Sequence, residues 1–572
     1  MTKHGCEYER WLQFADKDTV QELKTIENKP EEIEYRFGSM LSFGTAGLRG
    51  VMMAGLYAMN AYTVGAATKG LADYIKELGA EERGVLIGCD SRLNSGAFSK
   101  IAACVLAANG IKVYLFDELR PTPMVSFGTR YFGCIAGINI TASHNPKEYN
   151  GYKVYFEDGA QISPEQAEVI SSYIRKTDVF SVEKADFYSA VKEGKILLVG
   201  KDFDEIYLEK VLEQQVDPAV VPQMAKDLKV VYTPFHGAGY RLVPEALRRT
   251  GLKELYIVPS QAFPDGMFPT VVSPNPENPE GFVQGVALAK TIDSDLVIAT
   301  DPDCDRVGVM AKNKIGEFET ISGNCMGGLL LNYILSAHSE NDTMPPEPYA
   351  VKTIVSTDVA GEICKKFGVK LYEVLTGFKY IGEVIKKSEE AGRGSFILGF
   401  EESYGYLKGT YARDKDAVVA TMLIVEMAAY FKKKGMTLCD AKEELYRTYG
   451  YFAEHTANIQ MKGLDATERM KNLMAKIRKD PPKQIGGKTV ILVTDYLSSL
   501  STNIETGVTR SVDLPASDVL AFTLCDNSRI LVRPSGTEPK VKVYLLCRGE
   551  TREESEACLA ACKETMNAVI NG

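Results

Sequence analysis

A serine and a histidine stand side by side, as Ser143 and His144, in the polar segment 141–146. This segment directly follows the apolar run 134–140, which predicts a buried strand that delivers a loop to a sheet edge. A serine hydroxyl at such an edge can act as a nucleophile and carry a covalent group. Small polar residues after a strand also form ordinary turns, so this segment alone leaves both interpretations open.

Three carboxylates occur within five residues, at Asp301, Asp303 and Asp305, after another strand-like segment. They repel one another unless a cation binds between them, and hard oxygen ligands favour Mg²⁺ or Ca²⁺. An EF-hand also begins with alternating acids, but Arg306 and Lys312 stand where that loop needs glycine and glutamate. We therefore expect a dication site that keeps positions open for substrate, with a solvated acidic turn as the alternative.

Three further segments could contact a ligand. Segment 533–540 combines an arginine, hydroxyls and a glycine between two strand-like runs, which suits a phosphate dianion as well as a plain hairpin loop. Segment 399–406 presents paired acids and a serine, which suit sugar hydroxyls unless they are merely solvated. Segment 42–50 is glycine-rich with one arginine, Arg49; it does not match a P-loop, and its glycines would let a ligand approach closely.

The elements that position these loops alternate between strand-like and helical patterns, which predicts α/β units with largely parallel pairing. The expected strands include 84–88, 111–116, 228–232, 255–258 and 296–300, and the expected helices include 97–108, 243–250 and 281–290. The final part changes character. Strand-like runs at 518–525, 528–533 and 540–548 precede a helical segment at 551–570 and predict an antiparallel sheet with a helix.

Length, composition and charge restrict the class of protein further. A chain of 572 residues is too long for one core, and a net charge of −10 argues against general nucleic-acid binding. The 12 cysteines are scattered, which favours a reducing compartment, and they form no CxxC pair, so the sequence gives no signal for structural zinc; Cys558 and Cys562 are spaced as neighbours on one helix face. The longest apolar stretch, 417–431, contains Glu426 and is too short to span a bilayer, and no secretory signal is evident. We expect a cytoplasmic protein.

Together these segments resemble the α-D-phosphohexomutase superfamily, which includes phosphoglucomutases and phosphomannomutases. The resemblance extends from about residue 43 to residue 546 and rests on five motifs in order, FGTAGLRG, TASHNPKEYNGYKVY, DPDCDR, GFEESYGY and RPSGTEPK. It implies three α/β domains with mixed sheets and a C-terminal α+β domain with an antiparallel sheet, around a central cleft. The expected domains are 1–203, 204–316, 317–450 and 451–572.

The resemblance also implies roles for individual residues. Ser143 matches the serine that holds the catalytic phosphoryl group, with His144 beside it, and both are expected in the catalytic centre. The implied Mg²⁺ ligands are the phosphorylated Ser143, Asp301, Asp303 and Asp305. The implied catalytic basic residues are Arg49, Lys153 and Lys415. Substrate binding is implied for Arg306, Thr376, Gly377, Glu401, Ser403, Arg533, Ser535, Gly536 and Thr537.

The activity so implied is a reversible phosphoryl shuttle between α-D-glucose 1-phosphate and glucose 6-phosphate, with glucose 1,6-bisphosphate as intermediate and activator. Phosphomannomutase and phosphopentomutase activities of the same family are alternatives, and a metal-dependent sugar phosphatase is the alternative from another class. We expect small-molecule sugar phosphates as partners, no nucleic acid or membrane, and a monomer or homodimer. Cys304 departs from the pattern, because many relatives carry glycine there, and a thiol at that position could perturb the metal loop.

Overall fold

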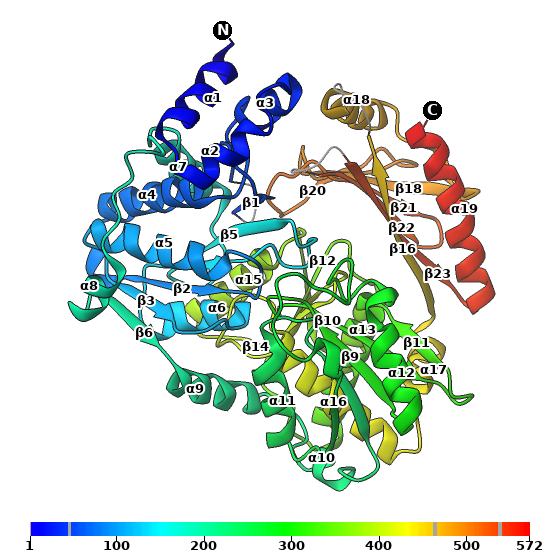
Figure 1. The fold of residues 1–572 in the computed structure, drawn as a ribbon. Coiled ribbons are helices and arrows are strands. Elements are labelled where there is room, and N and C mark those ends of the chain that lie inside the picture. Colours follow the sequence, from blue (N-terminus) through cyan, green and yellow to red (C-terminus); the bar gives the residue numbers. More distant parts are fainter. Residues whose placement is uncertain (1, 44–46, 462–465, 536–539, 572) are drawn as a thin grey trace. The chain divides into compact units, whose positions relative to one another are not determined.

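The computed structural model describes residues 2–43, 47–461, 466–535 and 540–571, which form two compact units. Unit 1 contains Met1–Ile321, Ile385–Glu390 and Tyr404–Thr437. Unit 2 contains Ser322–Val384, Ala391–Ser403 and Leu438–Gly572. Figure 1 labels the helices and strands of both units.

Unit 1 begins with three short helices, α1 (Lys3–Phe14), α2 (Lys17–Lys24) and α3 (Pro30–Phe37). The Thr2 hydroxyl caps α1, the Asp16 carboxylate caps α2, and a proline occupies the first position of α3. The helices bury the single tryptophan, Trp11, whose ring meets Phe37 edge-on at 5.6 Å. These helices are an addition to the sequence-based expectations, which assigned no structure to the polar N-terminal segment.

The first sheet of unit 1 has the strand order β1-β5-β4-β2-β3-β6 and is mixed. Strands β2, β3, β4 and β6 pair in parallel, whereas β5 runs antiparallel to β4 and β1. The strands are β1 (Leu48–Val51), β2 (Val85–Cys89), β3 (Val113–Phe116), β4 (Ala136–Ile140), β5 (Tyr149–Phe156) and β6 (Ile196–Val199). The associated helices are α4 (Ala61–Glu77), η1 (Glu81–Arg83), α5 (Ser95–Ala108), α6 (Thr122–Tyr131), α7 (Pro164–Ile174) and α8 (Phe187–Lys192).

Both faces of this sheet are buried, which explains why its central strands are apolar without alternation. On β2, Ile87 joins the core shared with α4, α5 and α7, while Leu86 on the opposite face meets α6 at Gly128. Figure 1 shows α5 and α6 on opposite sides of the sheet. Because β2 and β4 are parallel neighbours, the loops that follow them emerge at the same edge.

The second sheet of unit 1 has the order β11-β10-β9-β7-β8 and is also mixed, because β10 runs antiparallel to β9 and β11. Its strands are β7 (Lys229–Thr233), β8 (Glu254–Ile257), β9 (Leu296–Thr300), β10 (Val307–Lys312) and β11 (Phe318–Ile321). The remaining elements of unit 1 are α9 (Lys201–Leu212), α10 (Val220–Gln223), α11 (Gly239–Arg249), η2 (Pro259–Gln261), η3 (Pro279–Phe282), α12 (Val283–Ile292), β15 (Gly405–Leu407) and α16 (Ala417–Lys433). Helix α16 packs beside α10 and α11, and its Glu426 accepts hydrogen bonds from the backbone of Val216 and Asp217.

Unit 2 contains a parallel group of strands and an antiparallel sheet. Strand β12 (Pro348–Thr353) pairs in parallel with β13 (Lys370–Val374) and β14 (Ser395–Glu401). The nearby helices are α13 (Gly323–Glu340), α14 (Val359–Phe367), α17 (Leu438–Tyr449) and the first part of α15 (Phe378–Glu390), whose last residues belong to unit 1.

The antiparallel sheet of unit 2 has the order β16-β23-β22-β21-β18-β19-β20, with β17 paired to β18. Its strands are β16 (Tyr451–Gln460), β17 (Gln484–Ile485), β18 (Lys488–Asp495), β19 (Leu500–Asn503), β20 (Thr509–Ser511), β21 (Leu520–Leu524), β22 (Arg529–Pro534) and β23 (Lys540–Gly549). Helices α18 (Ala466–Lys479) and α19 (Arg552–Asn571) share one apolar core with a single face of this sheet, to which α19 contributes Met566 and α18 contributes Met474.

The predicted alternation of strands and helices, the antiparallel last sheet and the fold class are confirmed. The position expected to end the first domain, residue 203, lies within α9, while residues 316 and 450 lie between β10 and β11 and between α17 and β16. Within the described part of the chain, no helix is both long and apolar enough to cross a membrane. The apolar stretch 417–431 is instead the buried helix α16, as expected.

Candidate functional site

The aspartate loop connects the antiparallel strands β9 and β10 in unit 1. Asp301 follows the last residue of β9, and its Oδ1 accepts hydrogen bonds from the backbone N–H groups of Asp305 and Arg306, each at 3.0 Å. Cys304 takes a left-handed backbone conformation with φ of 54°. The side chains of Asp301, Asp303 and Asp305 are almost fully buried. The loop therefore folds around Asp301 and turns three carboxylates into the protein interior.

The three carboxylates form a single cluster, in which one oxygen from each lies within 4.8 Å of the others. Burial and repulsion from Asp303 and Asp305 raise the pKa of Asp301 well above its ordinary value. Burial also raises the pKa of Asp305, but the ammonium groups of Lys153 and Lys415 outweigh it and lower that pKa overall. Among the described residues, nothing donates a hydrogen bond to Oδ1 of Asp303 or Asp305. Buried carboxylate oxygens without a donor are costly, so the donor set fits a hard divalent cation.

The serine loop, residues 141–148 between β4 and β5, contacts this carboxylate cluster. Ser143 lies two residues beyond Thr141, which follows the end of β4, and adopts a left-handed conformation with φ of 53°. Its Oγ donates to Asp301 Oδ2 at 3.0 Å and lies 3.2 Å from Nδ1 of His144. Two loops that are 158 residues apart in the sequence thus meet at the expected nucleophile.

Arg92 and Asp90 hold the serine loop, and neither residue was predicted from the sequence. The buried Arg92 guanidinium donates to four backbone carbonyls, those of Ser143, Asn145 and Pro146 in the loop and that of Tyr149 at the start of β5. Asp90 pairs with the Arg92 Nε at 3.2 Å and accepts from the Thr141 hydroxyl at 2.6 Å. Both residues follow β2, the parallel neighbour of β4, so a polar pair after the predicted strand 84–88 was the available signal.

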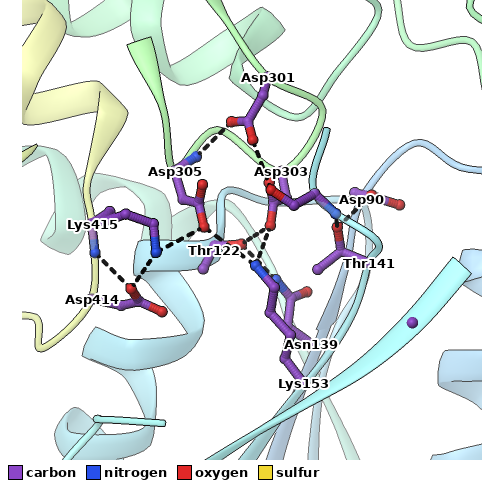
Figure 2. Close-up of polar contacts among 12 residues, drawn as sticks. Asp90, Thr122, Asn139, Thr141, Lys153, Asp301, Asp303, Asp305, Asp414 and Lys415 are labelled. Atoms are coloured by element: carbon purple, nitrogen blue, oxygen red, sulfur yellow. Dashed lines mark hydrogen bonds and ion pairs between the residues drawn. The ribbon is translucent and has the colours of Figure 1, made fainter. Parts of the chain in front are cut away.

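Two lysines neutralise the carboxylates (Figure 2). Lys153 on β5 places Nζ 2.7 Å from Asp303 Oδ2 and 3.2 Å from Asp305 Oδ2. Burial lowers the pKa of Lys153, but these carboxylates outweigh it and raise the pKa, so the ammonium stays charged. Lys415 Nζ lies 3.3 Å from Asp305 Oδ2 and 2.9 Å from Asp414 Oδ1. A Cβ at Gly405 would lie 2.2 Å from Lys415 Cδ, so glycine at that position makes room for the lysine side chain.

Further polar side chains orient the charged groups and were also missed from the sequence. Thr122 Oγ1 donates to Asp303 Oδ2 at 2.8 Å and accepts from Asn139 Nδ2 at 2.7 Å (Figure 2). Asp414 Oδ2 accepts from the Tyr155 hydroxyl at 2.9 Å. These buried contacts fix the rotamers of the carboxylates, which favours a preorganised site.

Three other expected residues of unit 1 surround Ser143. Arg49, an exposed residue on β1, donates to Asn145 Oδ1 of the serine loop at 3.1 Å. Arg306 pairs with Glu277 at 2.9 Å. Burial and the positive charges of Arg306 and Arg49 lower the pKa of His144 well below its ordinary value.

Cys304 belongs to the aspartate loop but not to its carboxylate cluster. A Cβ on Gly239 would lie 3.0 Å from the Cys304 Sγ, so this thiol packs against the first residue of α11. Burial, with the charge of Asp301, raises the pKa of the Cys304 thiol well above its ordinary value. The residue accordingly acts as a small buried side chain in a backbone position that glycine adopts more easily.

The remaining expected residues lie in unit 2. Thr376 and Gly377 separate β13 from α15, and the Gly377 N–H donates to Oε1 of the buried Glu401 at 2.9 Å. Ser403 follows Glu401 by two residues, beyond the end of β14. Arg533 lies on β22, and the N–H of Ser535 donates to the Lys540 carbonyl at 2.8 Å, so the segment does connect two strands as expected. Gly536 and Thr537 lie outside the described residues.

Four family models match the chain in order. They are phosphoglucomutase/phosphomannomutase alpha/beta/alpha domain I over residues 40–179, domain II over 205–316, domain III over 322–449, and the C-terminal domain over 508–561. The phosphoglucomutase of Staphylococcus saprophyticus is 35% identical over 545 residues, which cover 95% of this chain and 97% of the relative. That of Staphylococcus aureus is 36% identical over 548 residues, which cover 95% and 96%.

Solved structures share the fold. The open form of the exocytosis-sensitive phosphoprotein parafusin, a phosphoglucomutase from Paramecium, superposes with a TM-score of 0.68. The match covers 93% of this chain and 94% of parafusin at 16% sequence identity. A phosphoglucomutase/phosphomannomutase family protein from Burkholderia thailandensis gives a TM-score of 0.64 at 18% identity, covering 93% and 98% of the two chains.

Proposed function

Because the chain belongs to the phosphoglucomutase/phosphomannomutase family, we propose that it interconverts α-D-glucose 1-phosphate and glucose 6-phosphate through a phosphoserine at Ser143. The observation that carries this proposal is the 3.0 Å contact between Ser143 Oγ and the buried Asp301 carboxylate. A phosphoryl group on that oxygen would adjoin three carboxylates and two lysines. Support for glucose as the sugar comes from the staphylococcal phosphoglucomutases, which are similar along almost the whole chain.

In the proposed cycle, phosphorylated Ser143 transfers its phosphoryl group to the free hydroxyl of the sugar phosphate. The phosphorus–Oγ bond breaks, a phosphorus–oxygen bond to the sugar forms, and glucose 1,6-bisphosphate results. The intermediate then turns around, and Ser143 Oγ takes the phosphoryl group from the other end of the sugar. The His144 imidazole, whose Nδ1 lies 3.2 Å from Ser143 Oγ, can pass the proton that the sugar hydroxyl releases to Ser143 Oγ as the phosphorus–Oγ bond breaks, and the proton returns to the sugar oxygen in the second transfer.

Charge placement explains how the chain would favour this transfer. Asp301, Asp303 and Asp305 would hold a Mg²⁺ ion, which supplies positive charge beside the transferring phosphoryl group when bound. Lys153 and Lys415 add ammonium groups whose positions are fixed by carboxylates rather than by solvent. Fixed charges need no reorganisation during the reaction, which is the main way that proteins catalyse phosphoryl transfer.

Substrate recognition is proposed for residues of both units. Glu401, Ser403, Thr376 and Gly377 would bind the sugar hydroxyls, and the Glu401–Gly377 hydrogen bond supports a joint role for them. The phosphate that is not reacting would bind Arg306, Arg533, Ser535, Gly536 and Thr537. Both phosphates of the bisphosphate would use these groups in turn, because the sugar binds in two orientations. Four domains, 1–203, 204–316, 317–450 and 451–572, complete the proposal, together with a cytoplasmic monomer or homodimer.

A substrate panel tests the proposed activity. Glucose, mannose and ribose 1-phosphates are compared with excess Mg²⁺, with and without glucose 1,6-bisphosphate, while released inorganic phosphate is measured in the same samples. We expect the highest kcat/KM for glucose 1-phosphate, activation by the bisphosphate and negligible phosphate release. A preference for mannose or ribose phosphate would assign the alternative family activity, and stoichiometric release of phosphate would identify a phosphatase instead.

A further inference from the structure

Three cysteines of unit 2 converge in the core of the antiparallel sheet. Cys547 lies on β23, and Cys558 and Cys562 lie one turn apart on α19, which packs on that strand. Their Sγ atoms all lie within 4.8 Å of one another, and those of Cys558 and Cys562 are 3.9 Å apart. All three side chains are buried, with exposed fractions of 5% or less. None of these three cysteines forms a disulfide, so three thiol sulfurs lie around one point.

A carboxylate and a lysine adjoin the sulfurs. Asp526, in the turn between β21 and β22, has Oδ2 at 3.9 Å from the Cys558 Sγ. The Ser528 hydroxyl donates to the same oxygen at 2.9 Å and lies 3.7 Å from the Cys558 Sγ. Lys488 on β18 forms an ion pair with Asp526. Isolated core cysteines serve as small apolar side chains, whereas here a carboxylate and a lysine that pairs with it lie beside three thiols.

We propose that Cys547, Cys558 and Cys562 bind a thiophilic d¹⁰ cation, Zn²⁺; Asp526 lies beside Cys558 but outside the three-sulfur cluster, and would turn toward the sulfurs to supply a fourth ligand. Four ligands around zinc, with Zn–S bonds of about 2.3 Å, place sulfur atoms about 3.8 Å apart. The 3.9 Å between Cys558 and Cys562 matches this spacing, and small rotations bring in the third sulfur. Binding replaces the thiol protons by the metal, and the Lys488 ammonium offsets part of the remaining negative charge.

The proposed metal would fasten the C-terminal helix to the sheet. One ligand comes from β23 and two come from α19, so the ion would cross-link two elements that share one apolar core. The spacing of the ligands explains why the sequence does not predict this site, since structural zinc motifs usually begin with a CxxC pair. Here the helix supplies an i, i+4 pair, and the strand supplies the third sulfur from 11 residues upstream of Cys558. The site belongs to unit 2, whereas the aspartate cluster belongs to unit 1.

Cadmium titration of the full-length, reduced and metal-free protein tests this site. Cd²⁺ is the probe because its bonds to thiolates produce an ultraviolet charge-transfer band that carboxylate ligands do not produce. Excess Mg²⁺ is present throughout to occupy the carboxylate cluster, which prefers oxygen-seeking ions. We expect the band to saturate at one equivalent of Cd²⁺ and to form only at higher Cd²⁺ concentration when the site is first loaded with excess Zn²⁺. The absence of this band at saturating Cd²⁺ would overturn the proposal, regardless of how the variants behave.

Variants connect the band to the three sulfurs. Cys547→Ala and, in a separate variant, Cys562→Ala are expected to lose most of the band, whereas Cys134→Ala, which removes an equally buried cysteine of unit 1, keeps it. Zn²⁺ at about 100 times its Kd is expected to raise the unfolding temperature of the wild type by about 5 °C more than that of Cys562→Ala. An undiminished band in both ligand variants would place the thiolates elsewhere and overturn the assignment.

Discussion

Replacing Arg92 tests whether the serine loop depends on one buried guanidinium. In Arg92→Lys, a single ammonium replaces a guanidinium that donates to four backbone carbonyls and pairs with Asp90. Breaking a buried ion pair costs about 3–5 kcal/mol, and the charge that lysine retains reduces this loss to about 1–3 kcal/mol of unfolding free energy. The larger effect is expected on the reaction, because the carbonyl of Ser143 is itself one of the four acceptors.

A displacement of about 1 Å at a reacting group can cost about 100-fold in rate, so kcat for glucose 1-phosphate should fall about 100-fold. KM should change less than threefold, because the Arg92 side chain is buried and its N–H groups donate to backbone carbonyls. The assay is steady-state mutase kinetics with Mg²⁺ and glucose 1,6-bisphosphate, together with urea unfolding of each variant. Arg36→Lys is the matched control, because Arg36 is another buried guanidinium of unit 1, paired with Glu22 and Glu32. A normal kcat in Arg92→Lys, at the same loss of stability as the control, would refute the reasoning.

Further predictions concern pH, metal and phosphate. Burial raises the pKa of Glu454 to about 7 from an ordinary 4.5, so the folded protein favours the protonated carboxyl. The stability that this gives is fully present below about pH 4.5 and is lost as pH rises through 7. The urea midpoint of unfolding should therefore fall over this pH range in the wild type but not in Glu454→Gln. Asp303→Asn should weaken Mg²⁺ activation at least 10-fold, measured as the Mg²⁺ concentration for half-maximal activity; an unchanged value would remove Asp303 from the metal site. Arg533→Ala should raise KM about 10-fold with a smaller change in kcat, and an unchanged KM would exclude a phosphate-binding role.

The sequence predicted those parts of the fold in which local pattern and tertiary environment agree. Strands β2, β4 and β9 are buried on both faces, so their apolar runs were visible without knowledge of their neighbours. The loops after β4 and β9 carried unusual combinations of residues, which drew attention to Ser143 and Asp301. The N-terminal helices α1 to α3 have polar surfaces and bury few residues, and their pattern gave no comparable signal.

The supporting residues of the site could not be identified in the same way. Arg92, Thr122 and Asn139 act through partners that are distant in the chain, and sheet order brings these partners together. Arg92 reaches the serine loop because β2 and β4 are neighbours although they are not consecutive strands. The same limit applies to Cys547, which joins Cys558 and Cys562 only after the last helix packs on the last strand. A side chain whose role depends on such packing resembles any other polar or sulfur-containing residue in the sequence.

The most direct test of the central claim is to locate and follow the phosphoryl group. The protein is incubated with glucose 1,6-bisphosphate and Mg²⁺, and peptide mass spectrometry identifies the modified residue before and after excess glucose 1-phosphate is added. We predict one phosphate per chain on Ser143, its transfer to the sugar in a single turnover, and loss of both the phosphate and mutase turnover in Ser143→Ala. Wild-type turnover in Ser143→Ala, or a phosphate on another residue that exchanges with the sugar, would contradict the account.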